Sequence, residues 1–121
     1  SSEGLSVRAN AIAVETMEVV RVLRDQNWNN LGNLTPEMPY YLSFSESAKD
    51  WTIESSDTGK IQGIFSRSFY VYPVLRDAIT GKISASDGNS DSNTLKVEVM
   101  VGWNDRGRDK DIKLTTYLSN F

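Results

Sequence analysis

The chain changes its hydrophobic periodicity once, near residue 30. Between residues 5 and 26 there is no proline or glycine, and apolar side chains recur every three or four positions, as on one face of an α-helix. From residue 35 onward, short runs rich in β-branched and aromatic residues alternate with polar ones, and glycine, aspartate, asparagine and serine separate these runs. The pattern predicts an α+β fold in one domain, residues 1–121, with a long N-terminal amphipathic helix (about 5–26) packed on one antiparallel β-sheet (about 35–121).

The predicted helix has an apolar and a charged face. Its apolar face carries Leu5, Ala9, Ile12, Ala13, Thr16, Val19, Val20 and Leu23. On the opposite face, Arg21 lies at helical spacing from Glu18 and from Asp25, so that ion pairs can form there. We expect the carboxylates of this face to be solvated and ionised, which argues against a catalytic acid–base pair.

Six segments are predicted as strands: Tyr40–Phe44, Trp51–Glu54, Ile64–Arg76, Ile83–Ser86, Leu95–Trp103 and Asp111–Leu118. The last two alternate most cleanly, and the polar segment 104–109 between them contains Gly107, so we expect them to form a hairpin. Pro73 has no N–H for a ladder hydrogen bond, which predicts a bulge, an edge or a strand end at that position.

Composition excludes several classes of chemistry. The 121 residues include no histidine and no cysteine, which removes Ser-His-Asp and Cys-His catalysis, zinc fingers, thiolate chemistry and disulfides. Thirteen basic residues stand against sixteen acidic ones, a net charge of −3, so we do not expect a nucleic-acid partner. The uncharged apolar stretch at residues 9–14 is much shorter than the roughly 18–20 residues that a membrane span needs. We expect no catalytic residues and no cofactor.

The polar segment Ser84–Thr94 is predicted as a loop, and it contains one candidate metal site. Asp87, Asn89 and Asp91 place oxygen donors at alternate positions, and Glu98 follows at the twelfth place, which is a spacing that calcium loops use. The sixth place is a serine where an EF-hand needs glycine, and a strand follows where a helix should. The alternatives are a calcium loop of another kind or a solvated turn.

Aromatic residues are the second candidate binding feature. Tyr40, Tyr41, Trp51, Tyr70 and Tyr72 are capable of forming a surface for a sugar or a peptide. The alternative is that they fill or flank the core of a small sheet, as aromatic side chains commonly do.

Two stretches resemble the globular part of type IV pilins and of type II secretion pseudopilins. The first, residues 9–28, resembles the second half of the pilin helix in minor pilins, with a run of small residues, a Glu/Arg-bearing turn and the ending Arg24-Asp25-Gln26-Asn27-Trp28. The second, residues 95–103 followed by 106–108 and 114–120, is similar to the last hairpin of PilV-like and GspI-like proteins. The leader peptide and the hydrophobic first half of the helix that mark the family are not in this sequence.

The resemblance implies a non-catalytic filament subunit that is anchored in the cytoplasmic membrane before assembly and is then displayed at the cell surface. Its partners would be other pilin subunits, and it would meet the membrane only through a segment ahead of Ser1. We expect Leu5, Ala9, Ile12 and Ala13, in N-terminal turns that protrude from the domain, to pack against neighbouring helices in the filament. The alternative is that these residues pack on the domain's own sheet. The alternative function is an extracellular binding module that recognises a glycan, a peptide or DNA through the sheet face or the 84–94 loop.

Overall fold

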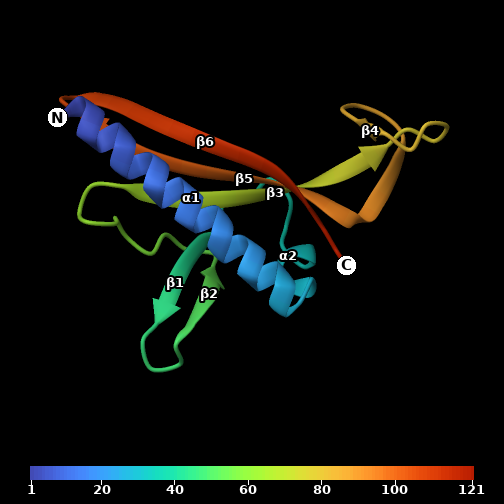
Figure 1. Ribbon diagram of the computed structural model, residues 1–121, viewed down its shortest axis with the longest axis horizontal. Coiled ribbons are helices and arrows are strands. Elements are labelled where there is room, and N and C mark those ends of the chain that lie inside the picture. Colours follow the sequence, from blue (N-terminus) through green and yellow to red (C-terminus); the bar gives the residue numbers. More distant parts are fainter.

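A computed structural model describes all residues from Ser1 to Phe121 and places one long helix across a face of an antiparallel sheet (Figure 1). The elements are α1 (Ser2–Gln26), α2 (Asn29–Gly32), β1 (Tyr41–Ser45), β2 (Asp50–Glu54), β3 (Ser66–Arg76), β4 (Ile83–Ser84), β5 (Asn89–Asp105) and β6 (Arg108–Ser119). The protein is therefore α+β, with an N-terminal helix and antiparallel sheets, as predicted. None of its helices combines the length and the apolar character required to span a bilayer.

Helix α1 begins three residues earlier than the periodicity predicts. The Ser1 hydroxyl accepts a hydrogen bond from the Gly4 N–H at 3.1 Å and so caps the first turn. The helix ends at Gln26 because Asn27 adopts an extended conformation, φ −165° and ψ 121°. The predicted apolar face is the buried one, and its residues join a single core cluster with the sheet.

The main sheet has four strands in the order β4-β3-β5-β6, all antiparallel. Val97, Val99 and Val101 of β5 are fully buried beneath α1, so the odd-numbered residues of this strand face the helix. The predicted hairpin forms between β5 and β6, with a turn of only two residues, Arg106 (φ 56°) and Gly107 (φ 85°). Two positive φ values in a two-residue loop define a type I′ turn, which matches the twist of the strands.

The expectation of one sheet is wrong, because β1 and β2 form a separate two-stranded sheet. This hairpin meets the main sheet at a single bridge, Tyr40 to Phe69. Beyond the bridge the hairpin folds on itself, with the rings of Phe44 and Trp51 centred 5.2 Å apart. It lies beside the C-terminal half of α1 (Figure 1), and Leu42 connects it to the core.

The prediction of a loop over residues 84–94 is correct for residues 85–88 and wrong for residues 89–94, because β5 already begins at Asn89. Gly88, at φ 111°, allows a sharp return from β4, after which residues 89–91 pair with residues 74–76 of β3. The predicted irregularity at Pro73 is confirmed, since the register of β3 against β5 shifts between Pro73 and Val74. Backbone pairing thus extends the sheet into a segment of low strand propensity and forms a flap, residues 76–94, beyond the core (Figure 1).

Candidate functional site

The residues predicted to pack in a filament lie on the inner face of α1. Ala9 and Ala13 are fully buried, Ile12 is nearly so, and Leu5 is partly buried against the same cluster. Their side chains contact the protein's own core, and the small alanines let the helix backbone approach the sheet closely. We therefore correct the expectation: in the folded domain these four residues are not available to a neighbouring helix.

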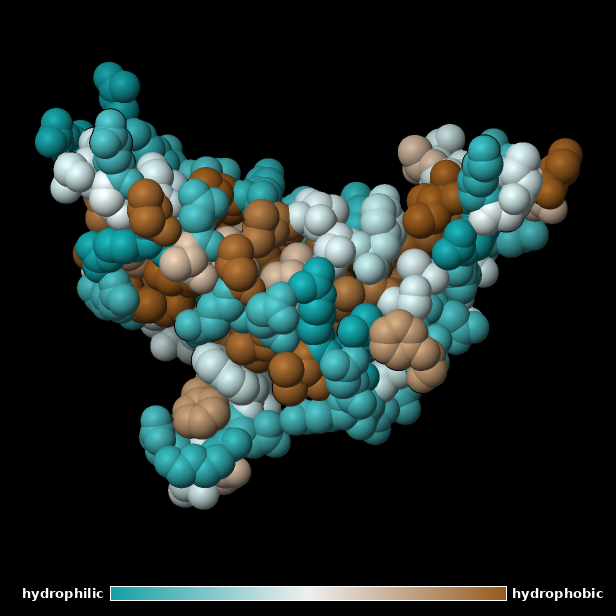
Figure 2. Space-filling model, in the orientation of Figure 1, coloured by the Kyte–Doolittle hydropathy of each residue, from teal (hydrophilic) through white to brown (hydrophobic).

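A different set of apolar residues runs along the outer face of α1. Val7, Val14 and Val22 are 69%, 53% and 48% exposed, and Ala11 is exposed between the first two. Their spacing of three, four or eight residues places them in one stripe along the helix. Figure 2 shows hydrophobic side chains interrupting the hydrophilic surface along the path of α1. We call Val7, Ala11, Val14 and Val22 the outer stripe.

One charged residue interrupts the outer stripe, and it is paired. The Glu18 carboxylate accepts a hydrogen bond from the Arg21 guanidinium at 2.6 Å, one helical turn away. Glu15, beside the stripe, pairs with Arg67 of β3 at 3.1 Å. A helix that only covers a sheet has a polar outer face, whereas α1 has apolar residues on both faces, which is typical of a helix with a second packing partner.

The first turn of α1 is fixed to the sheet and does not protrude. Asp105, at the end of β5, is buried, and its carboxylate lies 3.4 Å from the Lys110 amino group. The nearby Ser2 side chain lowers the pKa of Asp105, and Lys110 lowers it further, against the opposing effect of burial. The expectation of protruding N-terminal turns is therefore wrong. The buried Asp105 carboxylate lies at the N-terminal end of α1, where a negative charge is favourable to the helix dipole, and this places the first turn of α1 over the β5–β6 turn.

The three candidate calcium ligands are divided among different interactions. Asp87 accepts a hydrogen bond from Ser84 in the β4–β5 turn, and Asn89 pairs with Arg76 in the sheet. The Asp91 carboxylate accepts hydrogen bonds from the Arg76 guanidinium at 2.6 Å and from Thr94 at 2.9 Å. No group of three or more acidic side chains is gathered in a way that suits a metal ion. The positive charge beside Asp91 is therefore the guanidinium of Arg76, where the sequence pattern had suggested a calcium ion.

The Arg76–Asp91 pair makes the flap sensitive to acid. The hydrogen bond from Arg76, helped by the Asn93 N–H and Thr94, lowers the pKa of Asp91 from 3.8 to about 2. A carboxyl whose pKa is lower in the folded state stabilises the fold above its ordinary pKa, and this contribution is lost as the pH falls from about 4 to about 2. We expect amide exchange in residues 89–91, after correction for intrinsic rates, to accelerate over that range. In Asp91→Asn the exchange should already be fast at pH 6, and an equal pH dependence in both proteins would contradict the assignment.

The five aromatic candidates do not gather on one surface, and Tyr41 lies in β1 opposite Glu54 of β2. Tyr40 packs on Phe69, and Trp51 packs on Phe44, whereas Tyr70 and Tyr72 lie together on the face of the sheet away from α1, with ring centroids 6.4 Å apart. On that face the Lys96 amino group lies 4.9 Å from the Tyr72 ring centre, and burial, followed by the Glu98 carboxylate, raises the pKa of Tyr72. Tyr117 of β6 lines the same groove as Tyr72 and Lys96. Sequence reasoning missed Tyr117, although its alternation within the last strand places it on this face.

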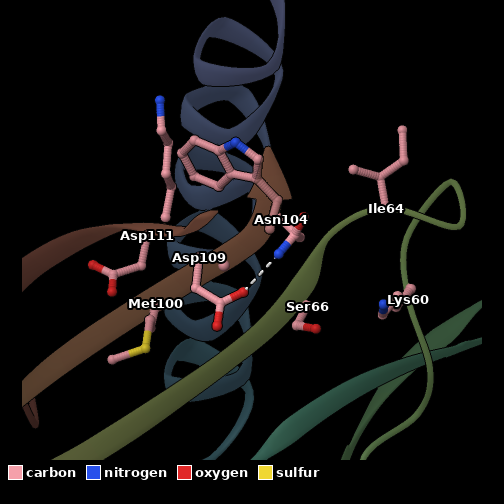
Figure 3. A pocket seen from close by; sticks show the side chains of 10 residues that line it. Lys60, Ile64, Ser66, Met100, Asn104, Asp109 and Asp111 are labelled. Atoms are coloured by element: carbon pink, nitrogen blue, oxygen red, sulfur yellow. Dashed lines mark hydrogen bonds between the residues drawn. The ribbon is translucent and has the colours of Figure 1, made fainter. Parts of the chain in front are cut away.

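A second shallow groove lies where the 60–64 segment meets the ends of β3, β5 and β6. Figure 3 shows it with α1 behind the strands: Lys60 and Ile64 border one side, Asp109 and Asp111 the other, and Ser66 and Met100 lie between them. The Asn104 side-chain amide donates a hydrogen bond to the Asp109 carboxylate at 3.0 Å (Figure 3). The groove is open to solvent, most of the residues that line it are polar or charged, and its carboxylates come from one strand.

Comparisons with family models, with curated proteins and with solved structures give no match to this chain. Among the surfaces of the chain, the outer stripe of α1 is an exposed apolar feature that the sequence analysis did not identify.

Proposed function

We propose that the protein is a non-catalytic subunit of a helical filament of the type IV pilus or type II secretion pseudopilus kind, similar to a minor pilin. In this proposal α1 packs against the helices of neighbouring subunits inside the filament, and the β-sheets face the solvent at the cell surface. The resemblance of residues 9–28 and of the segments 95–103, 106–108 and 114–120 to minor pilins suggested this function. We propose in addition that the helix and the sheets are arranged as in a pilin.

The observation that carries the proposal is the outer stripe. α1 already buries one face against the sheet, and the stripe offers a second apolar face along the same helix. Exposed single hydrophobic residues are ordinary on protein surfaces, but three valines and an alanine in one line, interrupted only by the paired Glu18, give a neighbouring helix an apolar seam. The small side chain of Ala11, between Val7 and Val14, permits the backbone of a neighbouring helix to approach closely.

In the proposed filament, the N-terminal end of α1 points toward the membrane and the filament core. An apolar helical segment ahead of Ser1 in the gene product would continue α1, hold the subunit in the cytoplasmic membrane before assembly, and then enter the filament core. The coding sequence upstream of Ser1 tests this directly. A start codon at this point with no apolar segment ahead of α1 would remove the proposal.

Val14→Glu tests the seam in the full-length protein, in the cells that encode it. A glutamate buried between helices without a partner costs several kcal/mol, so we expect the amount of subunit in sheared surface filaments to fall at least tenfold. Ile79→Glu is the matched control, because Ile79 is 95% exposed on the flap, away from α1. Normal incorporation of Val14→Glu, at equal cellular level and equal thermal stability, contradicts the proposal.

The second candidate function is a binding module that uses the outer face of the sheet. The observation in its favour is the groove that Tyr72, Tyr117 and Lys96 share, since aromatic rings beside a cation are a common surface for sugars and peptides. It differs from the filament proposal in one measurable respect: surface binding would depend on Tyr72 and Tyr117 and would be unaffected by Val14→Glu.

A further inference from the structure

Strand β6 is a long sheet edge without a neighbour. It runs for twelve residues, Arg108–Ser119, and pairs on one side with β5 through an unbroken register. It is the last strand in the order β4-β3-β5-β6, and no residue outside β5 forms a backbone hydrogen bond with residues 109–117. A long, regular edge of this kind is a template for another strand.

The type I′ turn determines which backbone groups of β6 are free. The residues that flank a two-residue hairpin turn, Asp105 and Arg108, form a hydrogen-bonded pair, and the pairs then alternate along the strands. The even-numbered residues of β6 therefore use their N–H and C=O groups with β5. The odd-numbered residues direct theirs outward, and these residues are Asp109, Asp111, Lys113, Thr115 and Tyr117.

The opposite edge of the sheet is covered, in contrast to β6. At β3, the Phe69 N–H and C=O both bond to Tyr40 at 2.9 Å, and the Val71 C=O accepts a hydrogen bond from the Glu37 N–H at 3.1 Å. β4 pairs with the far end of β3. The β6 edge has no such cover, and it contains neither a proline nor a bulge, which are two of the usual devices that prevent strand addition.

The side chains of β6 are complementary to themselves in one register. If two β6 strands pair antiparallel around a two-fold axis at Ile112, Asp111 of each copy lies opposite Lys113 of the other, and the two Ile112 side chains meet on the face that carries α1. Moving the axis to Asp111 or to Lys113 places two like charges directly opposite each other, which is destabilising. An axis at Leu114 brings no opposite charges together.

We infer that β6 is a dimer interface, at which a second copy of this chain adds its own β6 antiparallel around Ile112 and joins the two sheets into one of eight strands. Residues 109–115 of each copy then exchange roughly eight backbone hydrogen bonds. Ile112 and Leu114, which are only partly buried in one copy, become covered. The inference is independent of the filament proposal, because it uses neither α1 nor any residue ahead of Ser1.

The charges allow a swap and rescue experiment, read by sedimentation velocity of the purified protein from micromolar to millimolar concentration. Asp111→Lys or Lys113→Asp alone replaces both attractive contacts by repulsive ones, and we expect each to weaken the dimer roughly tenfold or more. The double variant D111K/K113D restores opposite charges across the axis and should recover wild-type association. Both residues are exposed, so thermal stability of the monomer should change little.

Thr115→Pro tests the backbone separately from the charges. The Thr115 N–H points away from β5, so proline there leaves the β5–β6 ladder intact but removes a hydrogen bond from the new edge, and we expect it to abolish the dimer. Val14→Glu should leave the dimer unchanged, which separates this interface from the outer stripe. A protein that is monomeric throughout, or a dimer insensitive to the charge variants and to Thr115→Pro, overturns the inference.

Discussion

Phe69→Ala lowers the free energy of unfolding by about 3–5 kcal/mol, the usual range for removing a fully buried phenylalanine. Phe69 is fully buried at the centre of β3, opposite Val99. Its ring lies 6.1 Å from that of Tyr40, and its main chain holds the only bridge to the residue that precedes β1. Because a small domain has a total stability of only about 5–15 kcal/mol, this loss is a large fraction of the whole.

Urea unfolding followed by far-ultraviolet circular dichroism measures this effect, and Phe44→Ala is its control. Phe44 is 41% exposed and contacts mainly Trp51 within the β1–β2 hairpin. Its removal should cost about 1 kcal/mol or less. If the two variants lowered the free energy of unfolding by similar amounts, the β1–β2 hairpin would contribute as much to stability as the helix–sheet interface, which contradicts the prediction.

Gly88→Ala disrupts the flap, at a cost of roughly 2–3 kcal/mol. A Cβ atom at Gly88 would lie 2.2 Å from the carbonyl oxygen of Arg76, a contact that the backbone has to relieve by moving. The residue also has a φ of 111°, where side chains are rarely tolerated. We expect the pairing of residues 89–91 with β3 to open, and amide exchange to report it there while β5 remains protected beneath α1.

Gly81→Ala is the control that separates steric contact from backbone conformation. Gly81 lies in the same flap with a φ of 71°, but a Cβ atom there meets open space. It should cost only about 1 kcal/mol, the price of the left-handed backbone alone. If both variants opened the flap equally, the contact with the Arg76 carbonyl would have no role in the turn.

The sequence was sufficient to predict the elements that have a regular period and a buried face. The helix α1, the second half of β5 and β6 could be predicted, because one buried side selects their side chains at fixed spacing. Residues 89–94 were predicted wrongly because their pairing depends on main-chain hydrogen bonds to β3 and on the turn at Gly88, and neither has a hydrophobic signature. The separation of β1 and β2 from the main sheet was missed for a similar reason, since register between distant strands is a tertiary property.

The residues predicted to pack against a partner lie on the face of α1 that is buried against the sheet. Periodicity identifies an apolar side of a helix but does not say whether that side meets the protein's own sheet or a partner. Leu5, Ala9, Ile12 and Ala13 were assigned to a partner because the N-terminal turns of the helix were expected to protrude beyond the sheet, whereas these residues pack in or against the core. From the sequence, the outer face of the helix was assigned to charged residues, among them Glu18 and Arg21, and the exposed valines on that face were not considered.

The parallel course of α1 and β6 determines how the molecule responds to tension. Both elements run in the same direction along its long axis, so the N- and C-termini lie at opposite ends (Figure 1). A pull on the two ends therefore loads the β5–β6 ladder in shear, and its hydrogen bonds resist together instead of parting one after another, as in a zipper. We expect the molecule to extend little under force along this axis, and the hydrogen bond from the Asn120 N–H to the Asn93 carbonyl connects its C-terminal end to the base of the flap.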